Sequence, residues 1–258
     1  MKREQDYEQE LATASPSVDG QEKDWIKADF HIHTLDDPKD RLNYSAHQLL
    51  ERARARNFDV LAITLHDKVF DRTEVFSEAA AIGILLLSAV ELRLEGADVV
   101  LLNVQPHEIE AIRTFADLRQ LRARRGESLF CFAPHPFFVL GGSLGERLEQ
   151  EIDCFDAIEI CHFHKGLFDL NRRARVVAAA HKKPLLATSD AHELEAFGAH
   201  FTMLPRPAEM TPEAIVQTLR RGSLRLTSPP SSWHDLLAVF YFVFIRHPLR
   251  QRWRRLFH

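Results

Sequence analysis

The chain has 258 residues, of which 45% are hydrophobic and 27% are charged. These values are ordinary for a globular protein and exclude a wholly disordered chain or a collagen-like fibre. The 33 Lys and Arg residues against 37 Asp and Glu residues give a formal net charge of −4. Because dedicated nucleic-acid binders are usually basic, we expect no stable nucleic-acid complex.

The cysteine and histidine content narrows the class of protein further. The three cysteines, Cys131, Cys154 and Cys161, form no CxxC pair and are typical of reduced thiols in a cytoplasmic protein. Histidine is the unusual residue type, since the chain has 14 histidines and only 10 glycines. Imidazole is the commonest metal ligand in proteins, so the positions of these histidines decide what the sequence predicts.

The first 24 residues are rich in charge and lack an apolar segment. This pattern predicts a flexible acidic lead-in over residues 1–24 and not a secretory signal.

Residues 229–258 form a different kind of end, with an apolar run followed by several arginines. The run is too short to cross a bilayer, so we expect a packed helix or tail. The alternative is a peripheral membrane contact, with Trp253, Leu256 and Phe257 at the lipid headgroups. The expected location is therefore cytoplasmic, with membrane association as the alternative.

Between residues 25 and 228, short apolar runs alternate with amphipathic patterns typical of helices. The expected strands are 26–33, 58–65, 84–91, 97–104, 128–134, 155–161, 184–190 and 199–205. The expected helices are 45–57, with Ser45 as its N-cap, and 72–83, 107–126, 144–153 and 167–183. Such alternation predicts one α/β domain with a parallel sheet, open or closed into a barrel.

Functional groups in a parallel barrel gather at the carboxyl ends of the strands. Six expected strands carry His, Glu or Asp there: His31 and His33, His66 and Asp67, Glu91, His135, Glu159 with His162, and Asp190 with His192. His31 and His33 are two residues apart on a strand, so both side chains leave the same face. Asp190 and His192 repeat this arrangement if the backbone stays extended. Mixed His and carboxylate ligands are typical of catalytic Zn, Mn or Fe sites.

These motifs resemble the PHP family, named for its polymerase and histidinol-phosphatase members. The family signature is HxH, ITDH, an isolated Glu, HP and SDxH; this chain has, in the same order, His31-Ile32-His33, Ile63-Thr64-Leu65-His66-Asp67, Glu91, His135-Pro136 and Ser189-Asp190-Ala191-His192. The resemblance runs from about residue 27 to residue 200. It implies a distorted seven-stranded, TIM-like (β/α) barrel with two or three divalent metal ions, Mn, Zn or Fe.

The resemblance also implies a ligand set. His31, His33, Glu91 and Asp190 would be shared ligands, and His66, His135 and His192 would complete the cluster. An Asp ligand that follows HxHT in many relatives has two candidates here; Asp37 is the expected ligand and Asp40 the alternative. Asp98 aligns with a further family ligand, and His162 stands where relatives often carry an amide, so metal binding by these two residues is left open.

The predicted activity is metal-dependent hydrolysis of a phosphoester, by a phosphatase or phosphodiesterase that acts on a small phosphorylated metabolite or nucleotide through a metal-activated water. His66, His192 and Asp190 are the catalytic candidates, since His66 or His192 could protonate the leaving alkoxide. Residues near strand ends that could bind a distal phosphate are Lys68, Arg93 and Lys165. The alternatives are a hydrolase of another bond type on a similar barrel and a non-catalytic metal-binding or membrane-recruited module. The sequence leaves the oligomeric state open.

Overall fold

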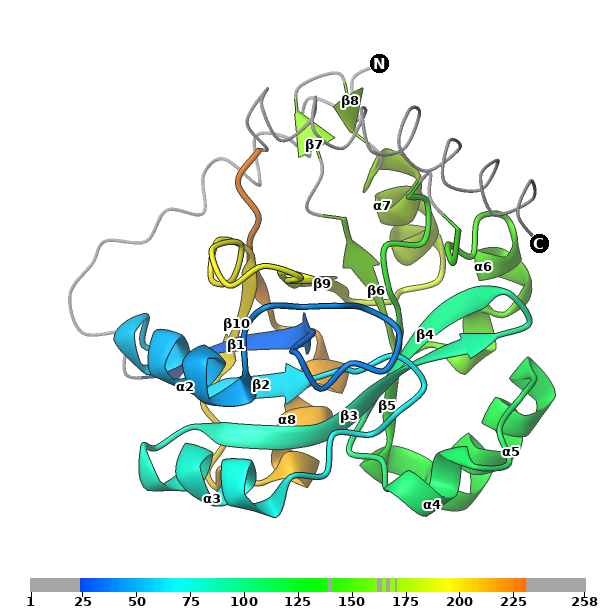
Figure 1. The fold of residues 1–258 in the computed structure, drawn as a ribbon. Helices are drawn as coiled ribbons and strands as arrows, with labels where there is room; N and C mark the ends of the chain where they lie inside the picture. The colour runs from blue at the N-terminus through cyan, green and yellow to red at the C-terminus, as the bar shows by residue number, and fades with distance from the viewer. Residues whose placement is uncertain (1–23, 139–140, 162–163, 166–167, 170, 231–258) are drawn as a thin grey trace, which may run out of the picture.

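The structure is a computed structural model that describes residues 24–138, 141–161, 164–165, 168–169 and 171–230. Its main feature is a strongly curved, nearly closed sheet with helices packed outside it (Figure 1). The nine strands of this sheet are β1 (Trp25–Ile32), β2 (Val60–Ile63), β3 (Leu85–Leu94), β4 (Ala97–Leu102), β5 (Phe130–Ala133), β6 (Ala157–Ile160), β9 (Leu185–Ala187), β10 (Phe201–Pro205) and β11 (Arg225–Thr227). Their spatial order is β11-β10-β1-β2-β3-β4-β5-β6-β9.

The sheet is mixed, so the expectation of a parallel sheet is wrong in part. Strands β1, β2 and β3 run parallel, as do β5, β6 and β9. Strand β4 is antiparallel to both of its neighbours, and β10 is antiparallel to β1 and β11. Glu95 and Gly96 explain the β3–β4 hairpin, because both have positive φ, 49° and 89°, as two-residue hairpin turns require. The barrel-like α/β fold is confirmed, but the count of seven strands is not.

Side-chain and backbone bonds draw the two halves of the sheet together beside β1. The segment after β9 pairs with β1 through a bridge between Ile32 and Ala191. The buried Asp29 carboxylate accepts hydrogen bonds from the backbone amides of His31 at 3.3 Å and Ser189 at 3.1 Å. The Thr202 hydroxyl bonds both the backbone N–H and the backbone C=O of Ala187, at 3.0 and 2.8 Å. These contacts bring the ends of β1 and β9 to the same rim.

The helices lie close to the expected positions. They are α2 (Ala46–Ala55), α3 (Thr73–Ala81), α4 (Pro106–Ile109), α5 (Phe115–Arg125), α6 (Arg147–Gln150), α7 (Asn171–Ala180) and α8 (Pro212–Arg221). Ser45 caps α2 in a capping box, as predicted. The single helix expected over 107–126 is two helices, because Thr114 accepts a hydrogen bond from the backbone N–H of Asp117 and starts a new one.

Helix α8 was not predicted, although its sequence carries clear start and stop signals. Thr211 caps it, Pro212 occupies its first turn, and Gly222 ends it with a φ of 72°. A short hairpin, β7 (His164–Lys165) with β8 (Phe168–Asp169), lies outside the main sheet.

Two other expectations concern parts of the chain outside this fold. None of the described helices is long and apolar enough to cross a membrane. The lead-in over 1–23 and the expected C-terminal helix over 231–258, with its membrane contact, lie outside the described residues. The domain limits at residues 24 and 228 therefore stay predictions.

Candidate metal centre

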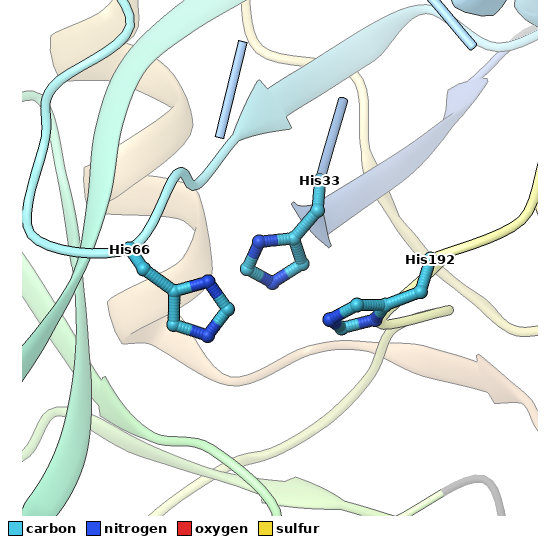
Figure 2. A group of neighbouring side chains, drawn as sticks. All are labelled: His33, His66 and His192. Atoms are coloured by element: carbon cyan, nitrogen blue, oxygen red, sulfur yellow. The ribbon is translucent and has the colours of Figure 1, made fainter. Parts of the chain in front are cut away.

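Side chains from six segments meet at the carboxyl ends of the strands. Figure 2 shows the rings of His33, His66 and His192, which follow β1, β2 and β9, around one point. Three sets of side chains each place one nitrogen or oxygen atom per residue within 4.8 Å of the others: His33, His66 and His192; His31, Glu91 and His135; and His31, His33 and Asp190. Residues separated by up to 161 positions in the chain are thus neighbours at one rim.

Strand β1 supplies the two innermost imidazoles, which are both fully buried. The Nε2 atom of His31 lies 3.4 Å from an oxygen of Glu91 and 3.4 Å from an oxygen of Asp190. The Nε2 atom of His33 lies 3.4 and 3.5 Å from the same two oxygens. Neither Nε2 has a hydrogen-bond partner among the described residues, and the same holds for that oxygen of Asp190. These unpartnered, converging atoms are what a bound cation requires.

Glu91 stands at the centre of the group. Its Oε2 lies 3.2 Å from Nε2 of His66 as well as near the two β1 histidines, and its Oε1 lies 3.6 Å from Nε2 of His135. The backbone at Glu91 pairs with His66, which fixes the carboxylate beside the loop that follows β2. A single carboxylate thus faces four imidazoles.

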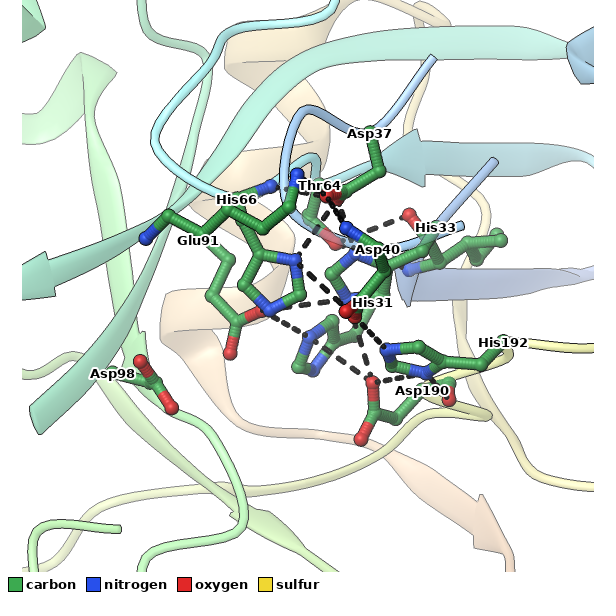
Figure 3. Close-up of polar contacts among 12 residues, drawn as sticks. His31, His33, Asp37, Asp40, Thr64, His66, Glu91, Asp98, Asp190 and His192 are labelled. Carbon is green, nitrogen blue, oxygen red and sulfur yellow. Dashed lines mark hydrogen bonds and ion pairs between the residues drawn. The ribbon is translucent and has the colours of Figure 1, made fainter. Parts of the chain in front are cut away.

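A second layer of carboxylates orients these imidazoles. Glu159, buried in β6, lies 3.1 Å from Nδ1 of His31, and it also contacts the Thr188 hydroxyl and accepts the backbone N–H of His135 at 2.6 Å. Asp37 lies 3.1 Å from Nδ1 of His33 and 2.9 Å from Nδ1 of His66. With Nδ1 donating to a carboxylate, Nε2 is the atom left for a metal ion. Figure 3 shows this arrangement for Asp37.

The titration behaviour of the centre follows from this crowding of acids around histidines. Burial disfavours a charged imidazole, but Asp190, Glu159 and Glu91 outweigh it and hold the pKa of His31 well above its ordinary value. The pKa of His135 is raised to about 9, since the carboxylates, Glu91 foremost, outweigh burial. In return, the imidazoles, His31 foremost, outweigh burial and hold the pKa values of Glu91 and Asp190 well below the ordinary range. The carboxylates therefore favour a positive charge at this place, on protons or on metal ions.

The backbone is strained at the same rim. Asp67, His135 and Asp190 have positive φ angles of 53°, 27° and 44°, which are uncommon for residues other than glycine. Such strain clusters at functional sites. It also corrects one expectation, because Asp190 is not extended, and His192 does not repeat the geometry of the β1 pair. The His192 ring instead turns back, with Nδ1 3.0 Å from the Asp190 carbonyl oxygen.

The remaining acidic candidates take different positions. Asp37 is buried and points at histidine Nδ1 atoms, whereas Asp40 lies at the mouth, 3.2 Å from Nε2 of His192 and 3.9 Å from Nδ1 of His66. Asp98 pairs with Arg93 and lies beyond Glu91 from the histidines in Figure 3. Burial, followed by repulsion from Glu91, raises the pKa of Asp98 to about 6.

The three candidates for phosphate binding are not gathered by the structure into one group. Lys68 is exposed and lines a cavity next to the rim together with Arg93. Lys165 belongs to β7, and its side chain, like the whole of His162, lies outside the described residues.

Two buried carboxylates at the rim were not among the predicted metal ligands or catalytic residues. Glu159 was visible at the end of its strand, but its contact with His31 joins positions 128 residues apart. Asp29 precedes the HxH motif by two positions, so the face that it shares with His31 and His33 was the available signal.

Comparison with known proteins adds to this geometry. A family model described as PHP-associated matches residues 169–224, and no curated protein matches. A two-domain protein from Bacteroides vulgatus that contains a predicted PHP-like metal-dependent phosphoesterase superposes with a TM-score of 0.61 at 18% identity, over 78% of this chain and 64% of that one. The resemblance to the PHP family is confirmed. This chain spans less than two thirds of that PHP-like protein.

Two further structures are similar to this chain in fold. PsfC from Pseudomonas syringae has a TM-score of 0.59 at 19% identity, over 86% of this chain and 98% of its own. Endonuclease Q in complex with a 27-mer duplex that has an abasic lesion at the active site has a TM-score of 0.54 at 15% identity, over 78% of this chain and 58% of its own. Our expectation of no stable nucleic-acid complex is contradicted by this neighbour of similar fold, which was solved with a DNA duplex. A modest net charge is therefore no evidence against nucleic-acid binding.

Proposed function

We propose that this chain is a metal-dependent phosphoesterase that hydrolyses a small phosphorylated metabolite or nucleotide. The observation that carries the proposal is the set of buried, unpartnered atoms at the rim, Nε2 of His31, Nε2 of His33 and one oxygen of Asp190, which face one another around Glu91. An unpartnered buried polar atom costs about 1–3 kcal/mol, and three together are costly unless a cation binds them.

The donors fit two divalent ions. His31, His33, Glu91 and Asp190 would be shared between the ions, and His66, His135 and His192 would complete the positions, with Glu91 central because it faces four imidazoles. Imidazole and carboxylate donors suit Mn, Zn or Fe. When bound, such ions lower the pKa of a water molecule and neutralise the oxygens of a phosphate.

The chain's own residues would supply the proton for the leaving group. His192 is 40% exposed and lies at the mouth with Nε2 beside Asp40. Burial opposes protonation, but Asp190 and Asp40 outweigh it and raise the pKa of His192. The raised pKa favours the protonated imidazole. His192 lies between the centre and solvent, so it is suited to protonate a departing alkoxide when a metal ion does not engage it. His66 is the less exposed alternative, since Asp37 holds its Nδ1.

The fold's likeness to endonuclease Q supports a second candidate substrate, a phosphodiester in nucleic acid. The two substrates make different demands, because a nucleic acid must reach the rim as a chain, whereas a small phosphoester enters alone.

The test is hydrolysis by the full-length chain loaded with Mn²⁺. The substrates are p-nitrophenyl phosphate, bis-p-nitrophenyl phosphate and a DNA duplex with one abasic site. The proposal expects metal-dependent release of p-nitrophenol from at least one of the two small esters. Cleavage of the duplex alone would favour the second candidate, and no hydrolysis of any of the three by a metal-loaded chain would refute both.

A further inference from the structure

A cavity of about 550 Å³ lies at the amino ends of β1 and β2, at the other end of the barrel from the metal centre. Lys27 near the start of β1 lines it, whereas His33 directly after the end of β1 belongs to the metal centre. The two residues are six positions apart along extended backbone, which is roughly 20 Å. Figure 1 shows this end of the sheet beside α2.

The walls of this cavity, called the basic cavity below, carry an excess of positive charge. Its charged residues are Lys27, Arg54, Arg56, Arg206 and a single acid, Asp59. Asp59 is already engaged, because it accepts hydrogen bonds from the Arg206 guanidinium at 3.0 Å and from the Lys27 backbone N–H at 2.9 Å. Within the described part of the chain, no carboxylate forms an ion pair with the side chains of the other three cations.

Lys27 shows this lack of a counterion most clearly. Its ammonium group lies 4.2 and 4.1 Å from the ring centroids of Phe58 and Phe201 and donates a hydrogen bond to the backbone oxygen of Arg56 at 3.2 Å. Burial, followed by the nearby Arg56 charge, lowers the pKa of Lys27 and outweighs the opposing effect of the Asp29 carboxylate. A half-buried cation beside another cation is stabilised by an anion that approaches both.

The cavity next to the rim is a useful comparison. Its volume is about 420 Å³, and its charged residues are Asp67, Lys68, Asp71, Arg93, Glu110 and Arg113. Three acids balance three cations there, so that cavity has no preference for an anion. The excess of positive charge therefore distinguishes the basic cavity from the cavity next to the rim.

We propose that the basic cavity binds a small organic phosphate, with the phosphate group against Lys27 and Arg54 and the apolar part against Trp25. Its volume is within the range of small-molecule sites. Arginine suits phosphate because its planar group donates two parallel hydrogen bonds. Trp25 and Phe58 also line the cavity. Phe58 is buried and Trp25 is partly exposed, so Trp25 is the aromatic surface available to a base or ring. The site is separate from the proposed phosphoesterase centre.

The test is isothermal titration calorimetry of the full-length chain with adenosine 5′-monophosphate, in EDTA so that no metal ion attracts the phosphate. We expect one binding event per chain. Arg54→Gln is expected to weaken binding roughly tenfold, as the loss of one charged hydrogen bond does. Arg124→Gln is the matched control, because Arg124 is also an exposed arginine in the last turn of a helix, α5, and is expected to leave the affinity unchanged. Lys27→Met provides a second variant with the same expected direction.

Further titrations distinguish phosphate binding in the basic cavity from binding at the metal centre and from binding of the nucleoside alone. His33→Ala is expected to retain the binding; its loss there would assign the phosphate to the metal centre and overturn the proposal. Adenosine without phosphate is expected to bind at least tenfold more weakly, and equal binding would overturn the proposal. Three other outcomes would overturn the proposal as well. They are no binding by the unaltered chain, equal weakening of binding by both arginine variants, and binding of a single-stranded oligonucleotide in place of the monophosphate.

Discussion

The two ends of the barrel collect opposite charges. At the carboxyl ends of the strands, Glu91, Asp190, Glu159 and Asp37 surround histidines, and the site favours cations. At the amino ends of β1 and β2, three cations have no paired carboxylate among the residues that the structure describes, and they favour an anion. The net charge of −4 averages over both ends, so it says little about either. This separation explains why total charge was a poor guide to binding partners.

The largest expected effect is the loss of bound metal when one of the proposed shared metal ligands is removed. His33→Ala and Asp190→Ala should each lose bound metal and hydrolysis together, by at least about 100-fold, because even outer-shell changes cost up to that factor. The measurement is metal per chain by mass spectrometry, with hydrolysis rates in parallel. His47→Ala is the control, since His47 is partly exposed and pairs with Glu78 between α2 and α3, away from the metal centre. Unchanged metal in both variants would contradict the assignment.

A smaller loss tests whether the second layer of carboxylates orients the imidazoles. Glu159→Gln keeps the shape of the side chain but removes the charge that contacts Nδ1 of His31. We expect metal affinity to fall by about 10–100-fold, with the circular dichroism spectrum unchanged. Glu149→Gln, an exposed position in α6, serves as the control. An affinity equal to that of the unaltered chain would show that Glu159 has no positioning role.

The contact between β9 and β10 gives a prediction about stability. Thr202→Val removes the hydroxyl that bonds both backbone groups of Ala187, and it leaves a buried N–H unpaired. The free energy of unfolding should fall by about 1–3 kcal/mol. Thr218→Val is the comparison, because that hydroxyl bonds only the Ala214 carbonyl of its own helix, and it should cost less. Denaturant unfolding of both variants measures the difference. Equal losses in the free energy of unfolding would contradict a stabilising role for Thr202 between β9 and β10.

The smallest expected effect is the change of metal affinity with pH, which arises because metal ions and protons compete for the same imidazoles. In the metal-free chain, the carboxylates raise the pKa of His135 to about 9 and those of His31 and His33 well above the ordinary value. At pH 7 His135 therefore carries a proton, and protonation of His31 and His33 is favoured. A metal ion must displace these protons, so metal binding should release protons and weaken as the pH falls. Calorimetry in buffers with different ionisation enthalpies counts these protons. A metal affinity that does not change between pH 6 and pH 8 would contradict the prediction.

Much of the candidate centre could be predicted because it depends on a simple rule of strand geometry. Short apolar runs identify the strands, and parallel strands bring their carboxyl ends to one rim, so His31, His66 and Glu91 were expected together. The structure brings them within contact distance. The same rule gave no information on Asp37 and Asp40, because both lie in a loop whose path depends on contacts with His66 and His192.

Other features depend on contacts between distant residues or on local signals that were missed. The Glu95–Gly96 turn and the Thr211–Pro212 start of α8 were local signals that predict an antiparallel hairpin and a helix. The basic cavity could not have been predicted, because it needs Lys27 from β1, Arg54 from α2 and Arg206 from the segment after β10 at one place.

The most direct test of the account is the metal content of the full-length chain after loading with Mn²⁺ and removal of free ions. The account predicts at least two ions per chain, their loss in His33→Ala, and hydrolysis of a phosphoester that follows the ion content. A folded chain that retains no metal, or the same metal content in His33→Ala as in the unaltered chain, would contradict the claim that the carboxyl-end rim is a metal centre.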